Sequence, residues 1–333
     1  PEEIKQVAID AIAEGLGNQY PPVHGLPDLR QAIAEHQERF YGLRIDPLTD
    51  VVVTTGASEA LGAALLALCQ EGDEVILFEP WFDIYAVGVA LANARRVAVP
   101  LRPPTFRPDL DALRDAVTDR TRLILLNSPH NPTGIVFTSE ELQAVADIAI
   151  ERDLIVISDE AYEHLWYDGH PHIPISTLPG MAERTITIGS AGKSFSFTGW
   201  KVGWATGPPH LIRAVRAVRQ HLSFVSGGPF QYAIAHGLRL PDSYFDGFRH
   251  DLQTKRDILT EGLVRIGFTV VPSEGTYFLT TDLGPFAELG DGLDVARALP
   301  HRAGVVAIPN QVFCDHPEVG ANALRWAFCK RPE

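Results

Sequence analysis

The feature that most constrains the fold is an alternation of short apolar strands with helices between residues 51 and 190. Strand-like runs lie at 51–55, 74–78, 95–99, 123–126, 154–158 and 185–188. Helix-like segments at 57–69, 83–92, 109–117 and 139–152 separate most of them. Strands that alternate with helices form mainly parallel sheets covered on both faces. We therefore expect an α/β unit built on such a sheet.

The rest of the chain predicts further helices and a second group of strands. Helices are expected at 1–13, 28–41, 209–223 and 242–265, and short strands near 268–271, 276–281, 304–308 and 323–328. The last group predicts a smaller α+β domain. We expect residues 1–27 to form an N-terminal arm and part of the small domain, 28–240 the large domain, and 241–333 the small C-terminal domain.

Charge and cysteine content limit the partners and the compartment. The 333 residues include 28 Lys and Arg against 42 Asp and Glu, a net charge of −14, which argues against nucleic acid or an anionic membrane as a partner. Cys69, Cys314 and Cys329 are far apart and form no CxxC pair, as is typical of a reducing, cytoplasmic setting. No apolar run approaches the roughly 18 residues of a membrane span. We expect a cytoplasmic protein.

Polar residues follow the carboxyl ends of four expected strands. They are Gly56-Ala57-Ser58 after 51–55, Asn131 in the loop after 123–126, Asp159 and Tyr162 after 154–158, and Ser190 and Lys193 after 185–188. Ligands of open α/β sheets bind at these ends. Singly, each group also suits an ordinary structural role, such as a helix cap, a turn or a solvated lysine. Together they offer an anion cradle, an amide, a carboxylate with a phenol, and an amine.

Pyridoxal 5′-phosphate would use all four groups at once. Its aldehyde needs a lysine amine for a Schiff base, its ring nitrogen needs a carboxylate, and its phosphate needs N–H groups, hydroxyls and a cation. Lys193 and Asp159 suit the first two roles. Gly56, Ala57, Ser58 and Ser190 suit the phosphate, together with the positive end of the helix that starts there. Lys201 can supply the cation.

Several motifs resemble the class I/II aminotransferases of fold type I. They are Asn131-Pro132-Thr133-Gly134, Ser158-Asp159-Glu160-Ala161-Tyr162, Ser190-Ala191-Gly192-Lys193 and Gly199-Trp200-Lys201-Val202-Gly203. Residues 18–20, 79–83, 127–132, 275–278 and 328–331 resemble more narrowly the branch of kynurenine/glutamine, methionine and actinobacterial N-succinyldiaminopimelate aminotransferases. The resemblance spans nearly the whole chain. It implies a large domain with a mainly parallel, seven-stranded-type sheet covered by helices, and a smaller α+β domain.

The resemblance also implies a role for each matching residue. Lys193 would bond the cofactor and later move a proton between the substrate and the cofactor. Asp159 would contact the ring nitrogen, and Tyr162 and Asn131 the phenolic oxygen. Phe82, rather than Trp81, would stack on the ring. The phosphate contacts would be Ala57, Ser58, Ser190 and Lys201, the last at a position where several branches of the family have arginine.

Two further implications concern the substrate and a second subunit. Arg325, with Asn131, would bind the substrate α-carboxylate, because a guanidinium can form a bidentate pair with a carboxylate. Tyr20 would reach the cofactor phosphate of a neighbouring subunit, and the loop from Phe224 to Gly228 would also cross. The expected active form is therefore a homodimer.

The function predicted from the resemblance is a PLP-dependent aminotransferase. It would move an amino group between an L-amino acid and a 2-oxo acid by a ping-pong mechanism, with a substrate of the N-succinyldiaminopimelate or the kynurenine/glutamine/methionine type. One alternative is a carbon–sulfur β-lyase that acts on cysteine conjugates with the same lysine. Another is the PLP-binding module of a transcription regulator, which would need a basic DNA-binding segment before Pro1.

Two weaker patterns are interpreted as surface features. His164, His170 and His172 lack a spaced carboxylate or cysteine partner and are assigned to a surface loop, so no metal is expected. The arginines at 213, 216 and 219 are interpreted as the solvated face of an amphipathic helix.

Overall fold

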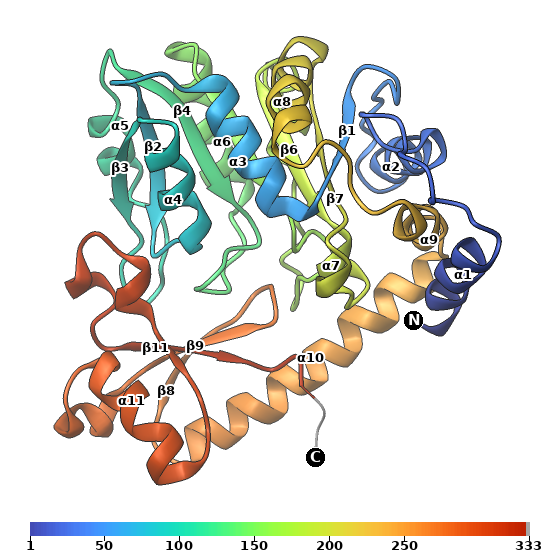
Figure 1. Cartoon of the computed structure of the whole chain (residues 1–333). Coiled ribbons are helices and arrows are strands. Elements are labelled where there is room, and N and C mark those ends of the chain that lie inside the picture. Colours follow the sequence, from blue (N-terminus) through green and yellow to red (C-terminus); the bar gives the residue numbers. More distant parts are fainter. Residues whose placement is uncertain (331–333) are drawn as a thin grey trace.

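Two β-sheets organise the chain in the computed structural model, which describes residues 1–330 (Figure 1). The larger sheet has seven strands in the order β1-β7-β6-β5-β4-β2-β3. Its strands are β1 (Val51–Thr54), β2 (Glu74–Glu79), β3 (Arg95–Pro100), β4 (Thr121–Asn127), β5 (Ile155–Asp159), β6 (Thr185–Ser190) and β7 (Gly203–Thr206). Every pair from β3 through β2, β4 and β5 to β6 is parallel, which confirms the expected mainly parallel sheet.

The strand β7 was not expected from the sequence. It runs antiparallel to both β6 and β1, and its sequence Gly-Trp-Ala-Thr starts with a glycine and lacks the apolar β-branched run that marks the expected strands. Its first residue, Gly203, packs against the start of α3 (Gly56–Leu68), where a Cβ would come within 2.6 Å of the Ala57 nitrogen. A side chain at residue 203 would therefore push β7 away from the helix.

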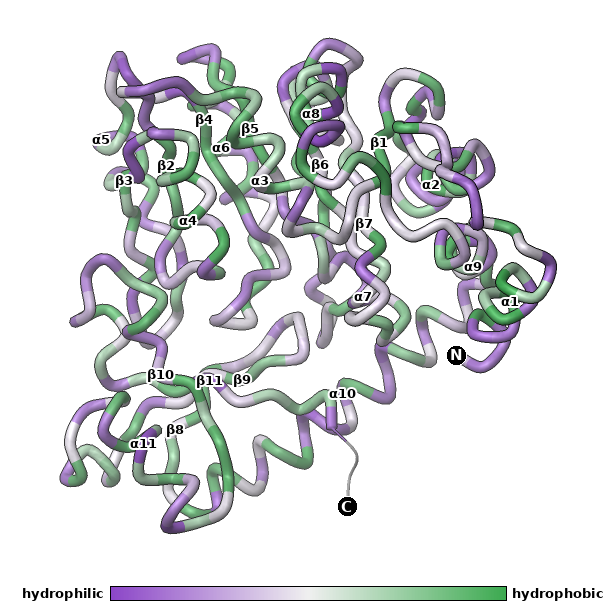
Figure 2. Tube along the Cα trace, viewed as in Figure 1, coloured by the Kyte–Doolittle hydropathy of each residue, from purple (hydrophilic) through white to green (hydrophobic). Residues whose placement is uncertain are grey.

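Helices cover both faces of the large sheet. The helices α3, α4 (Asp83–Leu91) and α8 (Pro209–Leu222) cover one face, and α5 (Leu110–Asp115) and α6 (Ser139–Glu151) cover the other. Successive residues of β2 alternate between the two apolar clusters, with Val75 and Leu77 in one and Ile76 and Phe78 in the other. Successive side chains of a strand point to opposite faces, and here both faces are buried, which explains why the strand sequences are continuously apolar. Hydrophobic strands of the large sheet are visible in Figure 2.

Three helices cover the β1 end of the large sheet. They are α1 (Glu2–Ala13), α2 (Pro27–Tyr41) and α9 (Gly228–Leu238). The helix α1 packs on α9, and its Ile4 and Ala8 join an apolar cluster with Val51 and Val53 of β1. The helix α9, which starts at Gly228, was not expected from the sequence.

The smaller sheet has four antiparallel strands in the order β10-β11-β9-β8. They are β8 (Thr269–Val271), β9 (Phe278–Asp282), β10 (Ile308–Pro309) and β11 (Ala323–Ala327). The helices α10 (Asp242–Arg265) and α11 (Gly292–Ala303) contact strands of this sheet. The helix α10 runs from the α1 end of the molecule to the sheet (Figure 1). The domain boundaries remain a proposal. Residues 331–333, which include Arg331 of the last motif, lie outside the described part.

The interpretation of the 209–223 arginines as a solvated face is wrong for Arg219. Its side chain is 1% exposed and lies 3.5 Å from the carboxylate of Glu59 on α3. It also donates hydrogen bonds to the carbonyl oxygens of Val23, at 2.9 Å, and Phe224. A buried guanidinium needs such partners, and two of them, Glu59 and Val23, come from segments distant in the sequence.

No helix among residues 1–330 has the length and apolar character that crossing a lipid bilayer requires.

Candidate active site

One cavity at the carboxyl ends of the large sheet collects nearly all the expected site residues. Those that line it are Gly56, Ala57, Ser58, Phe82, Asn131, Asp159, Tyr162, Ser190, Lys193, Lys201 and Arg325. The strand order explains this convergence, because β4, β5 and β6 are neighbours and end at the same edge. Arg325 comes from β11 of the small sheet, so both sheets contribute to the cavity.

The buried carboxylate of the cavity is Asp159, the last residue of β5. Its Oδ2 accepts a hydrogen bond from the Tyr85 hydroxyl at 2.7 Å, and its Oδ1 accepts one from the Ala161 backbone N–H at 3.1 Å. Burial raises the pKa of Asp159, while these two hydrogen bonds and the charge of Lys193 oppose that rise. Within residues 1–330 no cationic side chain forms an ion pair with Asp159. The carboxylate therefore suits a cationic ligand atom.

The amine of the cavity is Lys193, in the single helical turn α7 (Ala191–Ser194) after β6. Its Nζ donates a hydrogen bond to the Tyr277 hydroxyl at 2.8 Å and lies 5.6 Å from the centre of the Tyr162 ring. Tyr277 precedes β9 in the small sheet. The sequence identified Tyr277 only as part of a motif and assigned it no role, because its contact with Lys193 joins segments distant in the chain.

The end of the cavity that is suited to an anion lies at the start of α3. Gly56 has a φ of +75°, and the Lys201 Nζ lies 3.3 Å from where a Cβ on Gly56 would be. The first backbone N–H groups of a helix have no partner within the helix, and its dipole is positive at this end. Glycine thus lets the Lys201 ammonium approach the helix start, where Ser58 and Ser190 also line the cavity.

The guanidinium of Arg325 is held in place by an amide and two aromatic rings. Its Nη1 donates to Oδ1 of Asn131 at 2.8 Å. Its central carbon lies 4.2 Å from the ring centre of Phe278 and 4.8 Å from that of Phe313. Burial lowers the pKa of Arg325, but a guanidinium stays protonated in proteins. Arg325 thus presents an oriented positive charge at the cavity.

The residue directly before α4, Phe82, supplies an aromatic wall. Phe82 lines the cavity, whereas Trp81 is 4% exposed and belongs to the core between α3, α4 and the sheet. Tyr85 lies one turn after Phe82, with the two rings 5.8 Å apart and nearly perpendicular. Tyr85 also lines the cavity. The sequence did not single it out, because its hydroxyl meets Asp159 only in the folded chain.

The remaining expected residue, Tyr20, lies outside this cavity. Its side chain is 78% exposed and packs edge-on against Phe224, with the ring centres 5.2 Å apart. Residues 17–21 and 225–228 line a hollow beside this pair. A role of Tyr20 at the site of another subunit remains a prediction.

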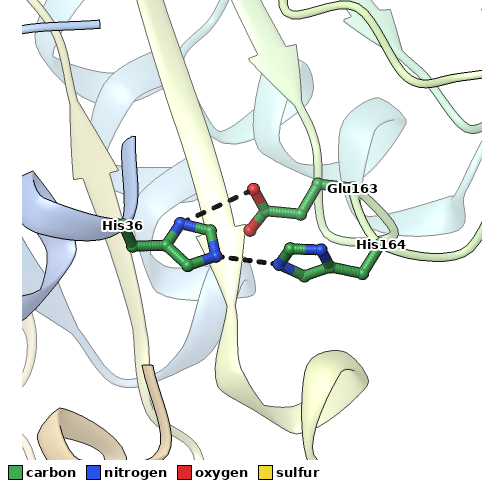
Figure 3. Close-up of side chains that lie close together, drawn as sticks. All are labelled: His36, Glu163 and His164. Carbon is green, nitrogen blue, oxygen red and sulfur yellow. Dashed lines mark hydrogen bonds and ion pairs between the residues drawn. The ribbon is translucent and has the colours of Figure 1, made fainter. Parts of the chain in front are cut away.

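A buried cluster joins His36 of α2 to Glu163 and His164 of the loop that follows β5 (Figure 3). His164 and His172 are 4% and 7% exposed, so their assignment to a surface loop is wrong. The Nε2 atoms of His36 and His164 lie 2.8 Å apart, and Oε2 of Glu163 lies 4.0 Å from the other ring nitrogen of His36. Glu163 also accepts a hydrogen bond from Tyr41 at 2.8 Å.

The distance between His36 and His164 is that of a hydrogen bond between side chains. Two nitrogens bound to one tetrahedral zinc at about 2.0–2.1 Å would lie about 3.3 Å apart. The 2.8 Å between His36 and His164 is the length of an N–H···N bond, and Glu163 faces the ring nitrogen of His36 that this bond does not use. The cluster therefore joins α2 to the segment that carries Asp159 and Tyr162.

The chemistry of the cavity fits pyridoxal 5′-phosphate. Asp159 is a buried carboxylate whose two hydrogen-bond donors are both uncharged, so a protonated ring nitrogen would supply the missing positive charge. Lys193 offers an amine for an aldehyde. The start of α3 with Lys201 suits a phosphate group.

Comparison with known proteins gives the family. Residues 1–329 match the family model "Aminotransferase class I and II". The chain is 49% identical to the probable N-succinyldiaminopimelate aminotransferase of Mycobacterium tuberculosis, with 100% of this chain and 86% of that protein covered. It is 38% identical to the kynurenine–oxoglutarate transaminase of Dictyostelium discoideum, with 99% and 84% covered.

Solved structures agree with this assignment. The N-succinyldiaminopimelate aminotransferase of M. tuberculosis superposes with a TM-score of 0.97 at 50% identity, over 100% of this chain and 86% of that one. YbdL of Escherichia coli, for which a methionine aminotransferase function is described, gives 0.95 at 36% identity, over 100% and 87%. The chain therefore belongs to the class I and II aminotransferases, which are fold type I enzymes dependent on pyridoxal 5′-phosphate.

Proposed function

We propose a role for each residue of the cavity in this aminotransferase, which moves an amino group between an amino acid and a 2-oxo acid. Lys193 would hold the cofactor covalently, Asp159 would pair with its ring nitrogen, and Tyr162 and Asn131 would donate to its phenolic oxygen. Phe82 would cover the ring. The phosphate would lie against Gly56, Ala57, Ser58, Ser190 and Lys201. The observation that carries the proposal is the convergence of Lys193, Asp159 and Arg325 on one cavity.

The bound cofactor supplies an electron sink that stabilises negative charge on the substrate Cα. Arg325, oriented by Asn131, binds the α-carboxylate and so orients the substrate in the cavity. The amine of Lys193 would take the proton from the substrate Cα as a general base and deliver it to the cofactor as a general acid. In the second half-reaction it would move a proton the opposite way, from the cofactor to the carbon that becomes Cα of the new amino acid. Tyr277, 2.8 Å from Nζ, holds this amine when it is not bonded to the cofactor.

For the amino donor we propose N-succinyldiaminopimelate, with donors of the kynurenine, glutamine and methionine type as the second candidate. The name of the M. tuberculosis relative, at 49% identity over the whole chain, supports the first. The names of relatives and neighbours at 36% and 38% identity support the second.

The test is a panel of these amino donors, each offered with 2-oxoglutarate as the acceptor. We expect the highest kcat/KM for N-succinyldiaminopimelate, followed through formation of glutamate. A higher kcat/KM for methionine or kynurenine would reject this donor and favour the second candidate.

We further propose a homodimer and a cytoplasmic location. The exposed pair of Tyr20 and Phe224 lies outside the chain's own cavity, as expected for groups that contact a second subunit. Cys69, Cys314 and Cys329 are unpaired, which is consistent with a reducing compartment.

A further inference from the structure

We propose that Tyr85 is a positioning residue that keeps Asp159 ionised and fixes the direction of its carboxylate. This inference rests on the proposed pairing of Asp159 with the cofactor ring nitrogen. The start of α4 would then have two roles. Phe82, directly before the helix, forms the aromatic wall, and Tyr85, in its first turn, supports the carboxylate.

The contacts of the carboxylate define its plane. Tyr85 donates to Oδ2 at 2.7 Å and the Ala161 N–H donates to Oδ1 at 3.1 Å. The two donors come from different elements, α4 and the loop after β5, so the carboxylate cannot rotate without breaking one of them. Each oxygen of a carboxylate can accept more than one hydrogen bond. Both oxygens therefore keep the capacity to accept from a ligand.

The charge of Asp159 depends on the same contact. Tyr85 and Asp159 are 2% and 4% exposed, and burial favours the neutral carboxyl group. The Tyr85 hydroxyl stabilises the ionised form and opposes the raised pKa of Asp159. Burial and the neighbouring carboxylate in turn raise the pKa of Tyr85 well above its usual value. The phenol thus stays a neutral donor throughout the pH range in which an aminotransferase can work.

The position of Tyr85 is itself held by packing. Its N–H donates to the carbonyl oxygen of Phe82 at 3.0 Å, and its ring meets the Phe82 ring edge-on. The ring also belongs to the core cluster between α3, α4 and the sheet. A phenylalanine at residue 85 would keep these apolar contacts and remove only the donor to Asp159.

The experiment measures the dissociation constant of pyridoxal 5′-phosphate from Tyr85→Phe, Asp159→Asn and the double variant, as a function of pH. We expect Tyr85→Phe to weaken binding roughly tenfold to hundredfold, the effect of one hydrogen bond to a charged group. The loss of affinity on acidification should begin at a higher pH than in the wild type, because Asp159 becomes easier to protonate. In the Asp159→Asn background, Tyr85→Phe should have little further effect.

Tyr167→Phe is the matched control. It removes another buried phenol hydroxyl, which donates to the carbonyl oxygen of Thr276 at 2.6 Å and lies outside the cavity lining. This variant should lower thermal stability without changing cofactor affinity. Circular dichroism of each apo variant verifies that it is folded.

The possible outcomes distinguish a failure of the role inferred for Tyr85 from a failure of the role proposed for Asp159. Unchanged affinity in Tyr85→Phe, with weakened binding in Asp159→Asn, would overturn the role of Tyr85 and leave the proposed function intact. Unchanged affinity in Asp159→Asn would reject the proposed role of Asp159 itself. Equal losses from Tyr85→Phe with and without Asp159 would show that Tyr85 does not act through the carboxylate and would also overturn the inference.

Discussion

Replacing Arg325 with lysine tests how the enzyme recognises the α-carboxylate of its substrates. Lysine keeps the positive charge but cannot form two parallel hydrogen bonds to one carboxylate. It also lacks the fixed plane that Asn131 and the rings of Phe278 and Phe313 give to the guanidinium. The substitution thus removes the bidentate hydrogen-bonding arrangement and keeps the positive charge.

The expected magnitude follows from the second hydrogen bond, which a lysine cannot donate to the same carboxylate. One hydrogen bond between charged groups contributes about 1.5–3 kcal/mol, which corresponds to a factor of roughly 10 to 150 in kcat/KM. The stacking of Arg325 on the two rings, at 4.2 and 4.8 Å, orients the guanidinium and does not touch the substrate. We therefore expect kcat/KM for an amino donor to fall by about two orders of magnitude at most, with cofactor affinity unchanged.

The assay compares L-methionine with the amine that lacks its carboxylate. The wild type should strongly prefer the amino acid, and Arg325→Lys should reduce this preference, because only the amino acid uses the guanidinium. Arg297→Lys, at an exposed position of α11, is the control and should keep the wild-type ratio. An unaltered ratio in Arg325→Lys would refute the assignment of Arg325 to the carboxylate.

Three further predictions concern other parts of the structure. Burial raises the pKa of Glu163 to about 8, so the stabilisation from its proton is complete below the usual carboxyl pKa and is lost as the pH rises through about 8. Between about pH 5 and pH 9 the wild type should therefore lose roughly a few kcal/mol of unfolding free energy that Glu163→Gln, which has no carboxyl group to titrate at this position, retains. The same pH dependence of urea unfolding in both proteins would contradict this. Tyr277→Phe should lower the rate of the half-reaction with an amino acid about tenfold in single-turnover kinetics, without weakening cofactor binding, and an unchanged rate would remove Tyr277 from the site. Mixing inactive Tyr20→Ala and Lys193→Ala subunits should restore activity through hybrid dimers, whereas no recovery after verified subunit exchange would place Tyr20 outside the partner's site.

The sequence predicts the parts of this fold that depend on local pattern. The six strands expected for the large sheet, and the helices between them, show the apolar runs and spacings that each element requires. The ends of β4, β5 and β6 converge because neighbouring parallel strands end at one edge, so Asn131, Asp159 and Lys193 can be grouped from the sequence.

The missed features depend on contacts between distant segments. The strand β7 has no apolar β-branched run and is defined by its pairing with β1 and β6. Arg219 has the spacing of a surface arginine but is buried because Glu59 and the carbonyl oxygen of Val23, both distant in the sequence, lie against it. His164 likewise finds its partner, His36, on α2. Local sequence contains no signal for such partners.

The same reason explains the two tyrosines that the sequence did not assign. Tyr85 has the spacing of a core residue on α4, and only the packing of α4 against the large sheet brings its hydroxyl to Asp159. Tyr277 meets Lys193 because the small sheet lies against the carboxyl ends of the large one. A residue that contacts a site residue from a different helix or strand can be identified from the structure, because no sequence motif contains both residues.

The most direct test of the central claim is to locate the cofactor on the chain. Borohydride reduction of the holoenzyme should convert the bond between cofactor and lysine into a stable amine, and peptide mass spectrometry should find the added mass on Lys193 alone. The Lys193→Ala variant should carry none. An adduct on Lys201 or on another lysine of the wild type, or the absence of any adduct, would contradict the assignment of Lys193.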